Sequence, residues 1–197
     1  RNVRILFATT RRPSDEPGRF FSGERELEET HYGKAAVRIP EQRAIGEISQ
    51  PFEFKVFGIV LDRETTDPER HFILEGCETM TKGEWLETVG RSGSAEALVF
   101  VHGFNVRFVD AVYRCAQITW DISYEGIPIL FSWASRGSTL DYLYDQGSAL
   151  GARDRFVRLL SDLQSAGLKR VHILAHSMGN YAVLEALAGH KNADDPL

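Results

Sequence analysis

The sequence predicts an α/β fold whose centre is a mostly parallel sheet with helices on both faces. Three apolar runs, at 97–101, 127–133 and 171–174, have the length and composition of strands that are buried on both faces. Segments with the helical spacing of apolar residues lie between these runs, and the links are short. Strands that alternate with helices in this way form parallel sheets.

The first half of the chain favours antiparallel strands that extend the same sheet. Alternating or apolar stretches bounded by turn residues predict strands at 3–7, 34–39, 52–61 and 71–77. We expect the last two to pair as a hairpin around the charged connection 62–70. Residues 10–31 are charged and contain two prolines, so they predict a long loop.

Three helices are predicted around the apolar runs. Thr81 and Glu84 are three residues apart, which is the spacing of a capping box, and they predict the start of a short helix. Apolar residues at helical spacing predict two longer helices, at 108–122 and 149–165. Gly167 ends the last of these just before the final strand.

Composition indicates one globular domain over residues 1–197. The formal net charge of −5 means that no overall basic character suggests binding to nucleic acid, and no apolar run is long enough to span a membrane. The two cysteines, Cys77 and Cys115, lie in apolar surroundings and predict free buried thiols. No spacing of Cys and His predicts a metal site, and Gly147 and Gly151 lack the pattern of a phosphate loop, so we expect no metal and no cofactor.

The stretch from 171 to 180 carries the strongest functional signal. A short strand leads into a tight turn with Ser177 at its tip, and a helix-forming run follows. This order is the context of a nucleophile elbow, in which small residues such as Ala175 and Gly179 leave room for the serine. The amide of Met178 lies at the start of the helix, where it has no partner within the helix, and is a candidate oxyanion donor.

A second turn follows the strand at 97–101. His102 and Gly103 come at the end of that strand, and the carboxyl ends of parallel strands lie at one edge of the sheet. We therefore expect this turn and Ser177 to face the same crevice. The amide of Phe104, or alternatively that of Asn105, is predicted to be the second oxyanion donor.

These residues resemble the α/β-hydrolase superfamily, and in particular a bacterial family of esterase/lipase-like hydrolases of unknown function. The departure from the wider superfamily is Ala175, where many relatives have Gly. The resemblance implies a soluble bacterial protein, from the cytoplasm or the periplasm. It covers most of the chain and rests on residues 7–12, Tyr32-Gly33, 101–105, 131–133, 141–145 and 174–180.

The resemblance also implies a catalytic acid and a histidine after the elbow helix, in the order Ser, acid, His. Only residues 189–197 follow that helix here, and they include His190, Asp194 and Asp195. These lie at the far end of a helix about 18 Å long, so we do not expect His190 to be the base. We expect a truncated domain that lacks its C-terminal strands, or an assembly, including self-association, that covers the exposed edge of the elbow strand.

The other polar and aromatic candidates are assigned to the pocket or to the core. His176 is expected in the pocket wall and His102 in a structural role near the crevice, while His172 is expected to be a core residue whose hydrogen bonds are satisfied. Ser132, Trp133 and Tyr142 are predicted to line the pocket, with a purely structural role as the alternative for the aromatic residues.

The sequence thus predicts a serine hydrolase that acts on carboxylic esters or related acyl compounds. Ser177 would attack the carbonyl carbon, the amides of Met178 and Phe104 would bind the oxyanion, and an acid and a His from outside this chain would complete the triad. The partner is then a small-molecule acyl substrate. The alternatives are an inactive hydrolase scaffold used as a binding module, and acyl transfer to an acceptor other than water.

Overall fold

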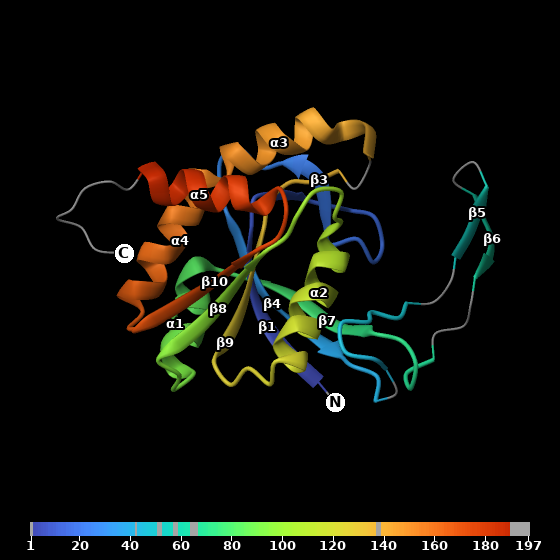
Figure 1. Cartoon of the computed structure of the whole chain (residues 1–197), viewed down its shortest axis with the longest axis horizontal. Helices are drawn as coiled ribbons and strands as arrows, with labels where there is room; N and C mark the ends of the chain where they lie inside the picture. Colours follow the sequence, from blue (N-terminus) through green and yellow to red (C-terminus); the bar gives the residue numbers. More distant parts are fainter. Residues whose placement is uncertain are drawn as a thin grey trace.

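The structure is a computed structural model that describes residues 2–41, 43–50, 53–56, 59–63, 67–136 and 139–189 (Figure 1). No helix in this part of the chain is long and apolar enough to cross a membrane. The strands are β1 (Asn2–Thr9), β2 (Arg11–Pro13), β3 (Phe21–Arg25), β4 (His31–Arg38), β5 (Glu53–Val56), β6 (Ile59–Arg63), β7 (Ile73–Met80), β8 (Glu96–Val101), β9 (Ile127–Ser132) and β10 (Arg170–Ala175). The helices are α1 (Lys82–Arg91), α2 (Phe108–Asp121), the short 3-10 turn η1 (Thr139–Asp141), α3 (Tyr142–Gly151), α4 (Arg153–Ser165) and α5 (Gly179–Gly189).

Six strands form the central sheet in the order β10-β8-β9-β1-β4-β7. The strands from β10 to β1 are parallel, and β4 runs antiparallel to both β1 and β7. The register pairs Ala175 with Val101 and Thr9 with Ser132, so the carboxyl ends of the four parallel strands reach the same edge. This arrangement confirms the predicted fold class.

Helices cover both faces of the sheet, as Figure 1 shows. One face packs Val99, Ile129 and Phe131 against α1, α4 and α5. The other face packs Phe100 and Leu130 against α2. Because successive side chains of a strand point to opposite faces, the apolar runs of β8 and β9 supply both layers of the core.

The outermost strand, β10, departs from this pattern. It pairs with β8 and, among the described residues, with no strand on its other side. His172 was expected in the core, but its side chain is 50% exposed and its Nε2 lies 3.1 Å from a carboxylate oxygen of Glu96. The prediction was wrong because this face of β10 is open to solvent, which also leaves Leu174 38% exposed.

Three predictions of secondary structure also need correction. The stretch 52–61 is not one strand paired with 71–77, because β5 and β6 pair with each other and β7 pairs with β4. The predicted loop 10–31 contains the two-stranded sheet of β2 and β3. The predicted helix 149–165 is divided, since its first residues belong to α3 and α4 begins at Arg153.

The capping box at the start of α1 is confirmed. The Thr81 hydroxyl accepts a hydrogen bond from the amide of Glu84 at 3.3 Å, and the Glu84 carboxylate accepts one from the amide of Thr81 at 2.9 Å. Two amides that have no partner within the helix are satisfied in this way. The cap fixes the direction of α1, whose Trp85 and Val89 are buried against the sheet.

The prediction of free thiols is also confirmed. Cys115 is buried on α2, Cys77 is half-buried in β7, and neither forms a disulfide. Burial raises the pKa of each thiol to about 12, so both remain protonated at neutral pH.

Candidate active site

Ser177 stands at the tip of the turn that joins β10 to α5. Its backbone adopts the left-handed conformation, with φ of 49°, and its side chain is exposed. A non-glycine residue is uncommon in this region, and such strain is often found at functional sites. The turn is held by hydrogen bonds from the amides of His176 to Val101 and of Gly179 to His176, both at 2.9 Å.

Gly179 is required by the close approach of this turn to the neighbouring strand β8. A Cβ atom at this position would lie 2.4 Å from the carbonyl oxygen of His102 and 2.8 Å from that of Val101. Backbone atoms cannot approach a side-chain carbon so closely. The small residue two positions after the serine therefore has the steric role that the sequence pattern predicts.

The turn after β8 lies directly beside the elbow. A Cβ on Gly103 would be 3.1 Å from Cβ of Ser177 and 2.7 Å from Nδ1 of His176. Asn105, two residues later, has the left-handed φ of 59°. The structure thus brings together the two turns that the sequence assigned to one crevice.

The amides of these turns differ in their hydrogen bonding. The amide of Asn105 donates to a carboxylate oxygen of Asp145 at 3.3 Å. Within the described residues, the amides of Phe104 and Met178 have no hydrogen-bond partner. Unpaired amides near an exposed serine are available to a ligand oxygen, which places Phe104 ahead of Asn105 as the candidate donor of this turn.

Arg11 connects the elements beneath the two turns, and sequence reasoning did not identify it. Its side chain is 1% exposed. It donates hydrogen bonds to the hydroxyl of Ser132 and to the carbonyls of Ser135 and Val106, at 2.8, 2.8 and 2.7 Å. Burial lowers the pKa of Arg11 to about 9, and the Asp145 carboxylate opposes this effect.

Asp145 is the second buried charge that sequence reasoning missed. It is 0% exposed in α3 and accepts hydrogen bonds from the Ser135 hydroxyl and from the amide of Arg136. A signal for it was present, because Asp145 precedes the buried residues Ser148 and Ala149 by three and four positions and so shares their face of the helix.

Comparison with known proteins gives the family. Residues 78–195 match the family described as alpha/beta hydrolase of unknown function (DUF900). The chain belongs to this family. The matched range includes both turns, whereas β1 and Arg11 precede it. Comparisons with curated proteins and with solved structures find no match.

His102 has a structural position in this alpha/beta hydrolase. It is 1% exposed, its ring stacks on Trp133 with centroids 4.8 Å apart, and its Nδ1 donates to the carbonyl of Gly103 at 2.8 Å. Nε2 then accepts from Ser132 and Arg11, at 3.1 and 3.3 Å. Burial, with the nearby cation of Arg11, lowers the pKa of His102 to about 3, so the ring is neutral at physiological pH.

The residues predicted to line the pocket fall into two groups. Ser132 and Trp133 are both 0% exposed and lie beneath the turn, where they support His102 and Arg11 instead of forming an open wall. Tyr142 is 46% exposed, and its ring packs edge-on against Phe104 with centroids 5.3 Å apart. Phe104 and Tyr142 thus form an aromatic surface next to the turn.

The remaining histidines that the structure describes differ in their surroundings. His31 lies beside Glu26, and His71 is buried and accepts a hydrogen bond from the amide of Asp67. His176 is exposed next to the serine. The other candidates that the sequence offered, His190, Asp194 and Asp195, lie outside the described residues.

Two cavities show where a ligand has room. A cavity of about 660 Å³ lies between α2 and β10, and its lining includes His102, Gly103, Leu174 and His176. A larger cavity of about 880 Å³ lies at the opposite edge of the sheet, lined by residues such as Asn2 and Pro128 at the starts of β1 and β9. This cavity lies at the ends of the strands that are far from Ser177, so its residues cannot take part in chemistry at the serine.

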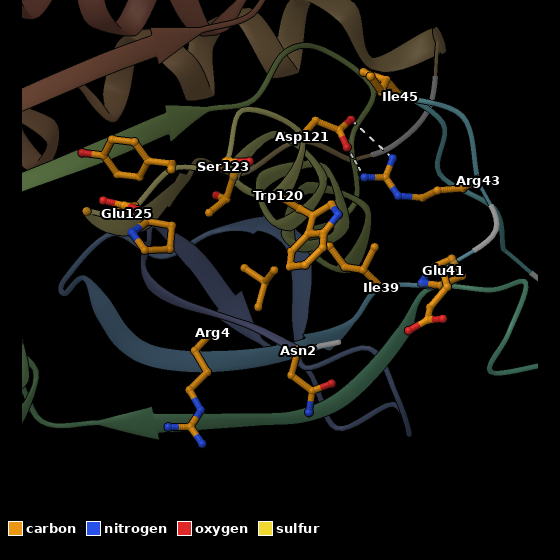
Figure 2. Close-up of a pocket in the computed structure, with 16 residues that line it drawn as sticks. Asn2, Arg4, Ile39, Glu41, Arg43, Ile45, Trp120, Asp121, Ser123 and Glu125 are labelled. Atoms are coloured by element: carbon orange, nitrogen blue, oxygen red, sulfur yellow. Dashed lines mark hydrogen bonds and ion pairs between the residues drawn. The ribbon is translucent and has the colours of Figure 1, made fainter.

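The larger cavity is bordered by a buried ion pair. Figure 2 shows Arg43 joined to Asp121 across one side of this cavity. Both side chains are 6% exposed, and Gly46 adds a backbone amide to the same carboxylate at 2.7 Å. Because the charges satisfy one another, this pair ties the segment after β4 to the end of α2. In the described part of the chain, no cluster of His, Cys, Asp or Glu could hold a metal ion.

Proposed function

We propose that this alpha/beta hydrolase is a serine hydrolase that acts on carboxylic esters or related acyl compounds. The observation that carries the proposal is the exposed, left-handed Ser177 between β10 and α5. A strand, a strained turn and a helix in this order present a serine hydroxyl at the edge of the sheet.

The proposed reaction begins with attack of the Ser177 hydroxyl on the acyl carbonyl carbon. The serine proton passes to a base, the carbonyl oxygen becomes an oxyanion, and the amides of Met178 and Phe104 donate to it. Collapse of the tetrahedral intermediate expels the alcohol with a proton and leaves an acyl-serine, which water then hydrolyses. The aromatic surface of Phe104 and Tyr142 suits the apolar part of an acyl group.

In this proposal, the catalytic base and its acid lie outside the described residues. Among the histidines described, His102 is buried with both ring nitrogens engaged, and His172 pairs with Glu96 on the exposed face of β10. We therefore assign neither of these two histidines to the triad.

A fluorophosphonate probe tests the proposal. The protein that carries the complete triad should be labelled covalently at Ser177, as located by peptide mass spectrometry, and Ser177→Ala should abolish the labelling. Hydrolysis of short-chain aryl esters should be lost in the same variant. A folded protein that is neither labelled nor active on esters would contradict the proposal.

Among the described residues no histidine forms a hydrogen bond with the Ser177 side chain, which also supports a second function, that of an inactive scaffold that binds a small molecule or a partner. In that case Ser177→Ala would leave ligand binding and biological activity unchanged. Acyl transfer to an alcohol is distinguished from hydrolysis by the products formed when alcohols compete with water.

A further inference from the structure

The turn between β8 and α2 is held by buried side chains from three distant segments. Arg11 donates to the carbonyl of Val106 at 2.7 Å, and the hydroxyl of Ser135 accepts from the amide of the same residue at 3.0 Å. Asp145 accepts from the amide of Asn105 at 3.3 Å. Three polar groups of the backbone, namely the amides of Asn105 and Val106 and the carbonyl of Val106, are therefore fixed from outside the turn.

The two buried charges meet at Ser135. Arg11 donates to its carbonyl at 2.8 Å, and its hydroxyl donates to Asp145. Arg11 also donates to the carbonyl of Ser22 at 3.2 Å, which attaches β3 to the same point. A buried charge is costly unless it is paired and hydrogen-bonded, so removal of either charge would leave the other uncompensated.

We propose that Arg11, with Asp145 as its counter-charge, is a positioning residue that holds the Gly103–Val106 turn so that the Phe104 amide is presented to the acyl oxygen over Ser177. This inference rests on the proposed function. The Phe104 amide has no partner among the described residues, and it lies next to the left-handed Asn105. Donors that are fixed before the reaction need no reorganisation in the transition state.

The side chain at position 11 must be arginine for this role. Its planar guanidinium donates through three nitrogens to acceptors in different directions, whereas a lysine ammonium is a single point with three donors. Arg11→Lys should therefore behave like Arg11→Ala. Free guanidinium, which has the same planar donor set, should fill the space left in Arg11→Ala.

The test compares labelling rates at Ser177 with the fluorophosphonate probe and ester turnover in the protein with the complete triad. Arg11→Ala should slow labelling by about 10²–10³-fold and lower kcat with little change in KM. Millimolar guanidinium, well below denaturing concentrations, should restore part of the rate in this variant and leave the wild type unchanged. Arg12→Ala, at the exposed neighbouring position, is the matched control and should keep the wild-type rate.

A second variant covers the case in which Arg11→Ala does not fold. Ser135→Ala removes one hydroxyl, and with it the acceptor for the Val106 amide, and should also reduce kcat more than it raises KM. If the wild type is labelled and either folded variant is labelled equally fast, or if guanidinium fails to restore Arg11→Ala, this inference is overturned while the serine hydrolase stands. If the wild type itself is not labelled, the proposed function fails first.

Discussion

Gly179 is the residue at which the elbow leaves least space. A methyl group there would meet the backbone carbonyls of His102 and Val101. Neither carbonyl can move unless the end of β8 moves with it. We predict that Gly179→Ala destabilises the fold by about 1–3 kcal/mol, because the added carbon must displace backbone. Urea unfolding measures this loss, and the fluorophosphonate labelling rate should fall with it.

Gly151→Ala is the matched control for this substitution. Gly151 ends α3, and a Cβ at this position would have no atom within 4 Å. Its stability and labelling rate should match the wild type or exceed it slightly, since alanine favours the helix. Equal stability of the Gly179 and Gly151 variants would show that the contacts at the elbow are not as close as described.

His102 links the stability of the protein to pH. Its pKa is lowered from 6.5 to about 3 by burial, so the unfolded chain takes up a proton below pH 6.5 while the folded chain does not until about pH 3. The free energy of unfolding should therefore fall as the pH drops through this window. Between about pH 7 and about pH 5, uptake of a proton by His102 in the unfolded chain should lower the free energy of unfolding by about 2 kcal/mol.

Urea unfolding of the wild type and of His102→Asn at these two pH values isolates this effect. The variant should be less stable overall, because it loses the stacking on Trp133, but its stability should depend less on pH. An identical pH dependence in the two proteins would be inconsistent with a buried neutral ring.

At the residue scale, sequence reasoning located the turns but not their supports. The small residues around Ser177 and Gly103 follow from local geometry, which a spacing pattern records. Arg11 and Asp145 are ordinary charged residues in the sequence. The burial of Arg11 depends on acceptors brought in by β3, by Ser135 and by the Val106 turn, and the burial of Asp145 depends on donors such as the Ser135 hydroxyl. The helix face that Asp145 shares with buried residues was a local signal of its burial, but no local pattern records the long-range partners of either charge.

The cap of α1 is an element-scale feature whose value can be measured directly. We predict that Thr81→Ala costs about 1 kcal/mol of stability and lowers Tm by about 2–4 °C, because the Glu84 amide loses its acceptor. Thr81→Ser retains the hydroxyl and should recover most of the loss. Thermal unfolding that is equal in all three proteins would contradict a contribution from this cap.

The presence of most helices and strands could be predicted from the sequence, but which strands pair with one another was harder to predict. The alternation in β7 correctly indicated a strand, yet alternation does not specify a neighbour, and β7 pairs with β4. The boundary between α3 and α4 was missed because Gly151 and Ala152 interrupt the helix without a proline or a charged cap. Register and pairing depend on the assembled sheet.

At the scale of the whole molecule, the edge of β10 that no described strand covers sets the expectation for self-association. Unpaired strand edges recruit other strands, and the apolar Leu174 is 38% exposed beside this edge. We predict that the weight-average mass in sedimentation velocity rises with concentration above the 22.2 kDa of one chain. Leu174→Lys should suppress the increase, because a charge at the edge opposes pairing.

Leu143→Lys is the control for general surface hydrophobicity. Leu143 is 80% exposed on α3, away from β10, so this variant should associate like the wild type. A wild type that stays at the mass of one chain at all concentrations would contradict the expectation. Equal suppression by both variants would assign the association to apolar surface in general.

The protonated state of the two native cysteines has a practical consequence for spectroscopy. Cys77 and Cys115 are the only cysteines in the sequence, and burial keeps both in the unreactive thiol form. Ser177→Cys would therefore place a single solvent-facing thiol at the elbow. A maleimide fluorophore or a nitroxide attached there would report motion at the mouth of the crevice without any prior removal of native cysteines.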